Sequence, residues 1–458
     1  MARAPWETAA ARDVSGAEAL ALGAGAAAQH DWTTPARLRE CASCGQFQMV
    51  PRLAPGSKAQ CIRCGTQLRR ARVDPLGRAL ALNIAALSIL GIACLMSLMT
   101  VSTAGMVRNA NLLSGPEGMG RSGLWPLSII VLFTTIAAPA LKLAAMTYVL
   151  LGLKLARPPR HVRRVYALVE HLRPWSMIEV YLLGVFVAYT KLIDLVHIEI
   201  GVALYALGIL MFTMIAADAV LDRQAVWEEM ERRGVPHGPL DHAAVAASAP
   251  RADAMGCHTC GLVCVAAEHG ERCPRCGSAL HGRKPNAIAR AWALLIAAAI
   301  LYVPANVYPV LQVIQLGSGA PSTILGGVVE LFDAGMYPLA ALVFFASVAV
   351  PMMKVIGLGT LLIMCQLGSA ARLRDRTTLY FVVNAVGRWS MIDIFMETIL
   401  VALVQFGSVV SIEPGVGAVA FCAVVVLTMF AAESFDPRLM WDSAGKNRHR
   451  ATQPAGAA

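Results

Sequence analysis

The chain has 458 residues, of which 57% are hydrophobic and only 15% charged, and its formal net charge is +10. A soluble domain is nearer a quarter charged, and its apolar residues are spread in amphipathic patterns rather than massed together. The composition therefore excludes an ordinary soluble globular protein. The basic residues lie mostly beside apolar segments, which favours membrane topology over nucleic-acid binding as the reason for the net charge.

The first 36 residues are rich in alanine, with scattered acidic residues and no clean apolar core. This pattern predicts a disordered tail over residues 1–36 rather than a cleavable signal peptide.

The chain contains two clusters of paired C-x-x-C-G knuckles. Four thiolates supplied by two short turns are the ligand set of a structural, tetrahedral zinc ion, and the glycine after each knuckle allows a positive φ. We therefore expect two zinc ions, one in a small β zinc ribbon at 37–72 and one at 253–283. Four thiolates leave no open position for hydrolytic catalysis, whereas redox cycling of the thiols stays an alternative. The eight predicted ligands are Cys41, Cys44, Cys61, Cys64, Cys257, Cys260, Cys273 and Cys276.

Eight mostly apolar stretches are long enough to cross a hydrocarbon core of ~30 Å. The second and sixth are longer than a span needs, which predicts that they tilt, kink or extend into the cytoplasm. The stretches cover residues 79–101, 124–153, 175–193, 200–220, 288–312, 337–367, 389–407 and 414–432.

The sequence repeats itself at an offset close to 214 residues. Trp175-Ser176-Met177-Ile178-Glu179, for example, matches Trp389-Ser390-Met391-Ile392-Asp393. We expect an all-α polytopic membrane protein with eight transmembrane helices in two four-helix repeats, each preceded by its ribbon. The repeats cover residues 75–228 and 285–441, with a linker at 229–252 and a disordered C-terminal tail at 442–458.

Lys and Arg concentrate in alternate loops, between spans two and three and between spans six and seven, whereas the opposite loops lean acidic. The positive-inside rule then predicts cytoplasmic termini and cytoplasmic ribbons. Since each half begins and ends on the same side, the two halves are predicted to be parallel repeats related by an axis along the membrane normal.

Charged residues fall within the apolar stretches. An unpaired charge at membrane depth costs ~3 kcal/mol or more, so we expect these groups to face the bundle interior and to pair. The repeat suggests that Lys142 pairs with Glu179. By the same logic, Lys354 pairs with Asp393. The full set is Lys142, Glu179, Asp218, Lys354, Asp393, Glu397 and Glu433.

Glu397 has the apolar Leu183 as its counterpart, so the second half has one carboxylate more than the first. Three interpretations of the charges stay open. They form structural ion pairs that fix helix register, they move a substrate or a proton, for which Glu397 is the most plausible group, or they snorkel to the membrane interface.

A proline lies three residues before each intramembrane lysine, at Pro139 and Pro351. Each removes a main-chain hydrogen bond and is predicted to kink its helix, freeing a carbonyl at the depth of the lysine.

With these features, the chain resembles the paraquat-inducible protein A family of Gram-negative inner-membrane proteins. The resemblance covers roughly residues 37–442 and rests on the doubled knuckles, the Trp-Ser-Met-Ile-Glu/Asp elements and the segment Ser434-Phe435-Asp436-Pro437-Arg438. It implies a partner, a periplasm-spanning MCE-domain protein, and a substrate class, membrane lipids carried between the inner and outer membranes, with a contribution to envelope integrity. The first half departs from the pattern, with Val220-Leu221-Asp222-Arg223 at its end.

Three functions are compatible with the sequence: a lipid-transport subunit, a secondary transporter of a small solute with or without proton coupling, and a membrane redox protein. No G-x-x-x-x-G-K-[ST], G-x-S-x-G or H-E-x-x-H motif occurs in the chain, so we expect neither a bound nucleotide nor an enzyme.

Overall fold

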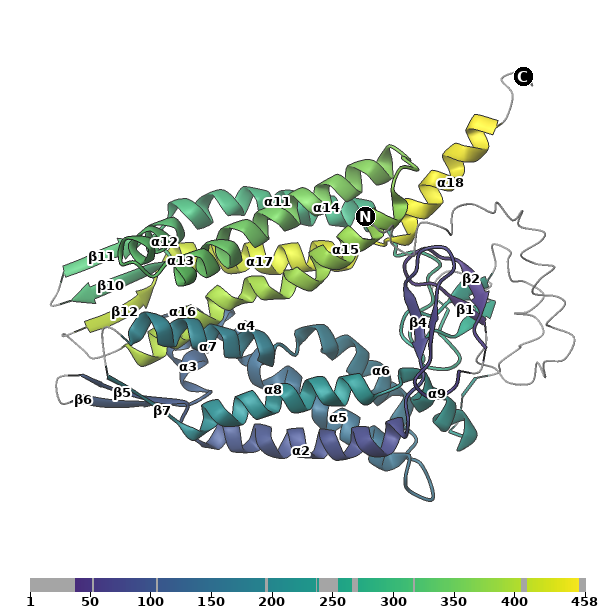
Figure 1. Cartoon of the computed structure of the whole chain (residues 1–458), viewed down its shortest axis with the longest axis horizontal. Coiled ribbons are helices and arrows are strands. Elements are labelled where there is room, and N and C mark those ends of the chain that lie inside the picture. Colours follow the sequence, from purple (N-terminus) through teal and green to yellow (C-terminus); the bar gives the residue numbers. More distant parts are fainter. Residues whose placement is uncertain are drawn as a thin grey trace, which may run out of the picture.

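The computed structural model describes residues 38–51, 53–103, 106–193, 197–235, 237–238, 254–265, 271–315, 318–404 and 410–452. The predicted N-terminal tail, most of the predicted linker and residues 453–458 lie outside this part of the chain. The helices run side by side between two ends, with the ribbon strands at one end and two small sheets at the other (Figure 1).

The helices of the first half cover most of residues 75–232. Their order is α2 (Pro75–Leu95), α3 (Ser114–Arg121), α4 (Trp125–Leu132), the π-helix η1 (Phe133–Ala137), α5 (Ala138–Gly152), α6 (Val162–Leu172), the 3-10 helix η2 (Arg173–Trp175), α7 (Ile178–Leu192), α8 (Val202–Val220) and α9 (Arg223–Arg232).

The second half has helices in the same order and of similar lengths. They are α11 (Ala287–Val307), α12 (Ile324–Asp333), α13 (Tyr337–Phe344), the π-helix η3 (Phe345–Ala349), α14 (Val350–Gln366), α15 (Leu373–Gly387), the 3-10 helix η4 (Arg388–Met391), α16 (Ile392–Leu403), α17 (Val416–Ser434) and α18 (Arg438–Thr452). Since α18 runs to Thr452, the C-terminal tail predicted from residue 442 begins as a helix.

Seven helices in the described part of the chain are long and apolar enough to cross a membrane, rather than the eight predicted. The segment Val162–Leu192 is one of them; its 31 residues comprise α6, η2 and α7, with a non-helical break at Ser176 and Met177, and exceed the ~20 residues that cross a hydrocarbon core. The predicted basic loops between spans are thus largely helical, as α6 and α15. The predicted span 389–407 is not among the seven, because α16 is short and Arg388, Asp393 and Glu397 lie close together in and before it.

The expectation of an all-α membrane part was wrong at the end opposite the ribbons, where each half has a three-stranded antiparallel sheet. The first is ordered β6-β5-β7, and the second β11-β10-β12. The predicted first span of each half therefore ends early, and its last residues begin a strand. The strands are β5 (Met99–Thr103), β6 (Met106–Ala110), β7 (His197–Ile200), β10 (Leu311–Gln315), β11 (Ser318–Ser322) and β12 (Val410–Pro414).

A π-helical turn precedes each intramembrane proline. In the first half, η1 ends two residues before Pro139, and η3 ends two residues before Pro351. A proline cannot donate to the carbonyl four residues earlier, and a π-turn is one way in which a helix accommodates the missing bond. Within η3, the Ser347 hydroxyl donates to the carbonyl of Val343 at 2.7 Å.

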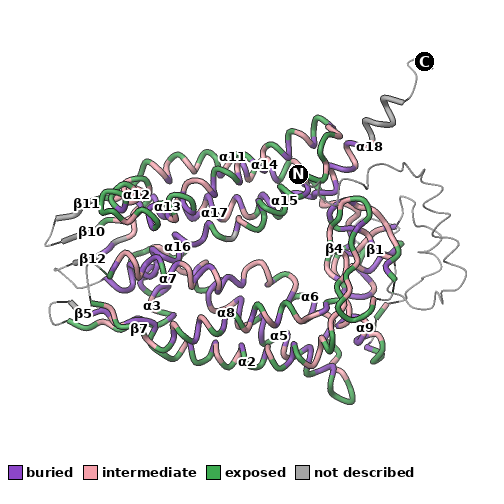
Figure 2. Tube along the Cα trace, viewed as in Figure 1, coloured by how far each residue is buried: buried purple, intermediate pink, exposed green. Residues whose placement is uncertain are grey.

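The contact between the halves centres on α7 and α16, which occupy equivalent places in the two repeats. All twelve residues of α16 are buried, and Figure 2 shows buried residues gathered around α7, α16 and α3. Gly184 of α7 permits the close approach. A Cβ there would lie 2.8 Å from the Cβ of Phe395 and 3.2 Å from main-chain atoms of Ile392 and Met396.

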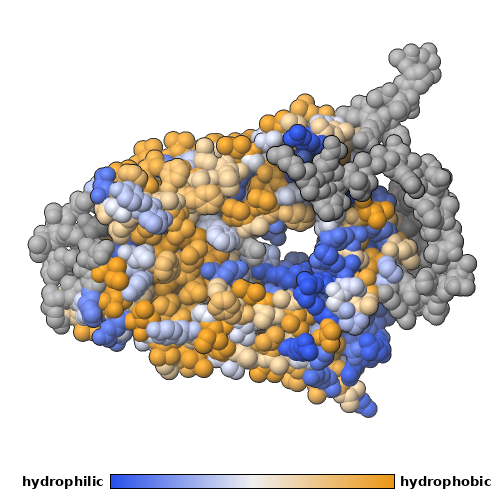
Figure 3. All heavy atoms as spheres, in the orientation of Figure 1, coloured by the Kyte–Doolittle hydropathy of each residue, from blue (hydrophilic) through white to orange (hydrophobic). Residues whose placement is uncertain are grey.

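Large apolar side chains cover the outer surface of the helices (Figure 3). Ile209 and Phe212 of α8, for example, are 58% and 67% exposed. Patches of this kind are rare on soluble proteins, and they fit contact with lipid tails. Hydrophilic side chains gather at the ribbon end instead, around an opening between the two halves (Figure 3).

Gly184→Leu should destabilise the contact between the halves. Because main-chain atoms and the Cβ of Phe395 cannot move aside cheaply, we expect a loss of about 2 kcal/mol or more in the free energy of unfolding. SDS titration of the purified protein, followed by tryptophan fluorescence, measures it. Gly208→Leu is the matched control, since a Cβ there meets nothing within 4 Å; equal losses in the two variants would contradict the assigned contact.

Candidate functional site: two cysteine clusters, their junctions and a buried charged pocket

The four knuckles share one main-chain geometry. In the first, the N–H of Cys41 donates to the carbonyl of Gln46, and the N–H of Gly45 donates to the carbonyl of Cys41. The same two bonds recur at Cys61, Cys257 and Cys273. The glycine that closes each knuckle has a φ between 68° and 79°, a region that other residues enter only with strain. The loops thus point paired thiols inward and leave main-chain groups satisfied.

The sulfurs of each cluster are spaced as a tetrahedral ion requires. Zn–S bonds of ~2.3 Å place tetrahedral sulfurs ~3.8 Å apart. In the first cluster, Cys41–Cys64 and Cys44–Cys61 are both 3.5 Å apart between Sγ atoms. In the second, the corresponding Sγ distances are 3.5 and 3.6 Å. Each set of four ligand atoms lies within 4.8 Å, so two buried four-cysteine clusters can each hold a metal ion.

The thiol chemistry of the first cluster suits a cation. The hydrogen bond from Cys44 is the main reason that the pKa of Cys41 is lowered to about 5. A lowered pKa favours the thiolate, the form that binds metal.

Each ribbon packs on the membrane helices of the opposite half. Cysteines of the first cluster share a core with Leu295, Phe435 and Trp441 of the second half. Cysteines of the second cluster share a core with Tyr166 and Trp227 of the first half. The ribbons also touch each other, since the N–H of Gly256 donates to Glu40 at 2.7 Å. The strands involved are β1 (Leu38–Glu40), β2 (Phe47–Met49), β3 (Lys58–Gln60), β4 (Gln67–Arg70), β8 (Ala254–Gly256) and β9 (Val263–Val265).

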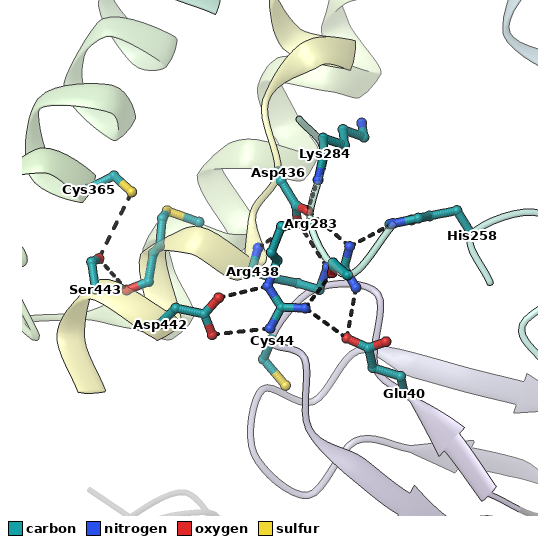
Figure 4. A network of polar contacts seen from close by, with 12 residues as sticks. Glu40, Cys44, His258, Arg283, Lys284, Cys365, Asp436, Arg438, Asp442 and Ser443 are labelled. Atoms are coloured by element: carbon teal, nitrogen blue, oxygen red, sulfur yellow. Dashed lines mark hydrogen bonds and ion pairs between the residues drawn. The ribbon is translucent and has the colours of Figure 1, made fainter. Parts of the chain in front are cut away.

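Arg438 joins both ribbons to the second half (Figure 4). Its guanidinium donates to Glu40 of the first ribbon at 2.7 Å, to Nε2 of His258 of the second ribbon at 2.6 Å, and to Asp436 at 3.0 Å. Arg438 and Asp436 are both only 1% exposed. Arg283 reinforces the junction by pairing with Asp442 at 2.7 Å.

The protonation states of this junction follow from its geometry. Burial, with the nearby charge of Arg438 second, lowers the pKa of His258 to about 4, so the ring is neutral and accepts the hydrogen bond. For Asp436, burial alone would raise the pKa, but the hydrogen bonds and charge of Arg438 outweigh it and hold the pKa below its ordinary value. Protonation of either group on acidification therefore weakens the junction.

A related junction holds the first ribbon to the first half. Arg69 pairs with Glu228 at 2.6 Å and with Asp222 at 3.3 Å. Asp222 also caps α9 by accepting from the N–H of Gln224, as Asp436 does for Arg438. At the position equivalent to Arg438, the first half has Gln224, whose side-chain oxygen accepts a hydrogen bond from Arg39 of the first ribbon. The two junctions therefore use equivalent positions in the two halves but differ in charge, because a neutral glutamine stands where the second half has an arginine.

The intramembrane lysines do not form the pairs predicted from the repeat. Lys142 pairs with Asp218 at 2.8 Å instead of with Glu179, which lies half-buried in the first turn of α7. Lys354 donates to the hydroxyl of Thr428 at 3.2 Å instead of pairing with Asp393. The repeat gives the two lysines and their two predicted acidic partners equivalent positions in the two halves. It does not determine which residue of α8 or α17 faces each lysine.

Glu433 takes no part in the pairing of Lys354. Its side chain is exposed at the ribbon end, and the ammonium of Lys284 donates to its main-chain carbonyl. The acid equivalent to Asp218 is thus outside the helix interior of the second half.

Asp393 and Glu397 line a pocket next to the second sheet. Both are buried, at 5% and 3% exposed, and they lie one turn apart on the same face of α16. Lys191 of α7 also lines this pocket and interacts electrostatically with both carboxylates. The pocket is partly open to solvent. It therefore gathers charges from both halves.

Several of these residues were missed at the sequence level. Lys191 sits at the end of an apolar stretch, where it resembles an ordinary flanking residue, and no offset match marks it. Arg69 and Arg283 lie 214 residues apart, as do Asp222 and Asp436. Because 214 is the repeat offset, these residues occupy equivalent positions in the two halves, and the repeat could have pointed to their pairing.

Seven membrane-length helices with two four-cysteine ribbons define a multi-pass membrane protein with candidate metal centres. The family model described as Paraquat-inducible protein A matches residues 76–231 and 288–445, once in each half. The chain belongs to the paraquat-inducible protein A family.

The chain is similar to two curated proteins of Escherichia coli (strain K12). It is 34% identical over 410 residues to "Intermembrane transport protein PqiA", a match that covers 89% of this chain and 96% of that protein. It is 30% identical over 410 residues to "Lipophilic envelope-spanning tunnel protein A", covering 88% and 91%. No solved structure matches the chain.

Arg438→Gln should weaken the whole ribbon end. The substitution leaves the buried carboxylate of Asp436 without its paired cation and leaves Glu40 with Arg283 alone, at 3.1 Å; removing one partner of a buried pair typically costs about 3–5 kcal/mol. Arg121→Gln is the control, because Arg121 pairs with Glu117 on the surface, where an ion pair contributes about 0–1 kcal/mol. SDS titration of the two purified variants compares them; equal stabilities would contradict the proposed weight of the junction.

Proposed function

We propose that the chain is the inner-membrane subunit of a pathway that transports lipid between the inner and outer membranes. In this proposal it works with a periplasm-spanning MCE-type protein and contributes to envelope integrity. The observation that carries the proposal is the similarity over nine-tenths of the chain to proteins named for intermembrane transport and for a lipophilic envelope-spanning tunnel. Since those relatives are named as transport proteins, we assign the chain no enzymatic activity.

We further propose eight membrane crossings in two parallel repeats, with α15, η4 and α16 together making the seventh. The equal order of elements in the two halves supports this topology. Both ribbons lie at one end of the helices, as a parallel repeat requires (Figure 1). The basic residues of α6 and α15 favour the cytoplasm for that end and for both termini, and the periplasm for the two sheets.

In the proposed topology, each ribbon holds one zinc ion. The spacing of the sulfurs and the four alike knuckles support zinc over other metals, because four thiolates in tetrahedral array are its usual structural site. Zinc would fold the ribbons and, through the junctions, fix the cytoplasmic ends of the two halves relative to each other. No chemical step is assigned to it.

Lipid transfer tests the proposed function. Donor vesicles that contain the full-length chain are mixed with the purified periplasmic partner, and the partner is recovered and analysed by lipid mass spectrometry. We expect the chain to raise the phospholipid loaded on the partner severalfold above that from empty vesicles. A partner that acquires no more lipid from chain-containing vesicles would refute the proposal.

Membrane topology can be checked by labelling single cysteines in intact cells with an impermeant maleimide. His197→Cys, beside the first sheet, should react from outside, because β7 is proposed to lie in the periplasm. Arg160→Cys, in the connection between α5 and α6, should react only after the cells are opened. Outside labelling at residue 160 would invert or break the proposed topology.

Metal content provides a third check. The purified chain should hold about two zinc ions, and the double substitution of Cys61 and Cys64 by Ser should remove one of them by elemental analysis. Because the first ribbon packs on the second half, the same variant should also lower the stability of that half. Wild-type chain that folds fully without metal would contradict the assignment.

A further inference from the structure

The pocket that contains Asp393 and Glu397 lies beside α12 of the second half. In the first half, the short helix α3 packs directly on α16, and a Cβ on Gly115 would lie 2.8 Å from the side chain of Thr398. At the equivalent Gly327 of α12, a Cβ would meet only the hydroxyl of Ser322, at 3.6 Å. The two-fold relation of the halves is broken at this place, and a space remains beside α12.

One side of this pocket is a strong hydrogen-bond acceptor. Oδ2 of Asp393 and Oε2 of Glu397 are buried and have no hydrogen-bond partner among the described residues. Lys191 lines the same pocket and interacts electrostatically with both carboxylates and with Glu330. With two acids and one base, this wall retains an uncompensated carboxylate, which is costly at membrane depth unless a proton or a bound cation neutralises it.

The other side of the pocket suits an anion. Thr323, Ile324 and Gly327 belong to the first turn of α12, and all three line the pocket. Thr323 caps the helix by accepting from the N–H of Gly326 at 3.1 Å. The N–H of Gly327 donates to the carbonyl of Thr323, so the N–H groups of Ile324 and Leu325 are the ones without an acceptor among the described residues. With the helix dipole, such groups favour a phosphate. Ser322 supplies a hydroxyl at the same wall.

We propose that this pocket binds the phosphoethanolamine headgroup of a phospholipid, with the ammonium between Asp393 and Glu397 and the phosphate at Lys191 and the first turn of α12. The proposal rests on the proposed function and names the headgroup class that it handles. A charge-separated headgroup matches a charge-separated pocket, and its acyl chains can remain among the apolar side chains that line the rest of the site, such as Val343, Met396 and Phe421.

The carboxylate acceptors of the pocket favour the ethanolamine headgroup over other headgroups. A primary ammonium donates three hydrogen bonds, which the unpartnered carboxylate oxygens accept. The quaternary ammonium of choline donates none and is bound best by several aromatic faces, whereas Phe421 is the one aromatic residue among those that line this pocket. Glycerol headgroups carry no cation for the carboxylates. Phosphatidylethanolamine is therefore expected to be retained over the other two lipids.

A competition between lipids tests the site directly. The full-length chain is equilibrated in micelles with equal amounts of phosphatidylethanolamine, phosphatidylcholine and phosphatidylglycerol, repurified, and its retained lipids are counted by mass spectrometry. Wild type should retain phosphatidylethanolamine over phosphatidylcholine by about tenfold, the effect of one lost charge-assisted hydrogen bond. Asp393→Asn and Glu397→Gln should each bring this ratio close to one, and Lys191→Gln should lower retention of all three lipids.

Two further variants separate binding from folding. Gly327→Leu fills the pocket without changing a charge and should abolish the selectivity. Glu117→Gln, on the exposed face of α3 at the same end of the helices, should keep it. Equal retention of the three headgroups by wild type, or unchanged selectivity in Glu397→Gln and Gly327→Leu, overturns the site.

A parallel transfer measurement distinguishes this failure from that of the proposed function. If the periplasmic partner is loaded with lipid without headgroup preference, the site is wrong and the function stands; if no lipid is loaded at all, the function fails. Soluble phosphoethanolamine forms the last arm. Binding of the soluble molecule at the affinity of the lipid would assign the pocket to a free metabolite and overturn the lipid headgroup as its ligand.

Discussion

Two carboxylates on one short helix cannot face hydrocarbon, and this constraint organises the middle of the protein. The buried helix α16 carries Asp393 and Glu397 and is covered by its own half and by α7 and α3 of the other. Burial costs less when the wall opposite carries a cation, which Lys191 provides from α7. The halves are therefore more than two bundles joined by a linker, because the acidic helix of one half needs residues of the other.

The ribbon end adds a second link of the same kind. Each ribbon precedes one half in the chain but packs on the other, and Arg438 contacts both ribbons at once. Ribbon ends tied in this way restrict how far the halves can separate there, whereas the opposite ends carry two separate sheets. Any motion that opens the pocket beside α12 is accordingly expected near the sheets, at the end proposed to meet the periplasmic partner.

The repeat and the knuckles could be predicted from the sequence, because a fixed offset and a C-x-x-C-G spacing can be recognised without knowing how the chain packs. The partners of the intramembrane lysines could not. Lys142 meets Asp218 and Lys354 meets Thr428, since the rotation of α8 and α17 about their axes, and not the offset, decides which side chain faces the lysine. The sheets at Met99–Thr103 and Leu311–Gln315 were hidden for a related reason: their apolar strands continue the apolar composition of the preceding helices. The prolines marked a real irregularity, whose form, a π-turn, was set by the surrounding helix.

Carbene footprinting of the native chain in liposomes, with a photoactivated lipid-soluble diazirine and peptide mass spectrometry, tests the central claim that α16 crosses the membrane inside protein. The account predicts strong labelling of outward residues of α8, such as Ile209 and Phe212, and labelling of residues 392–403 close to background. Labelling of 392–403 as strong as that of α8 would place the acidic helix against lipid and contradict the account.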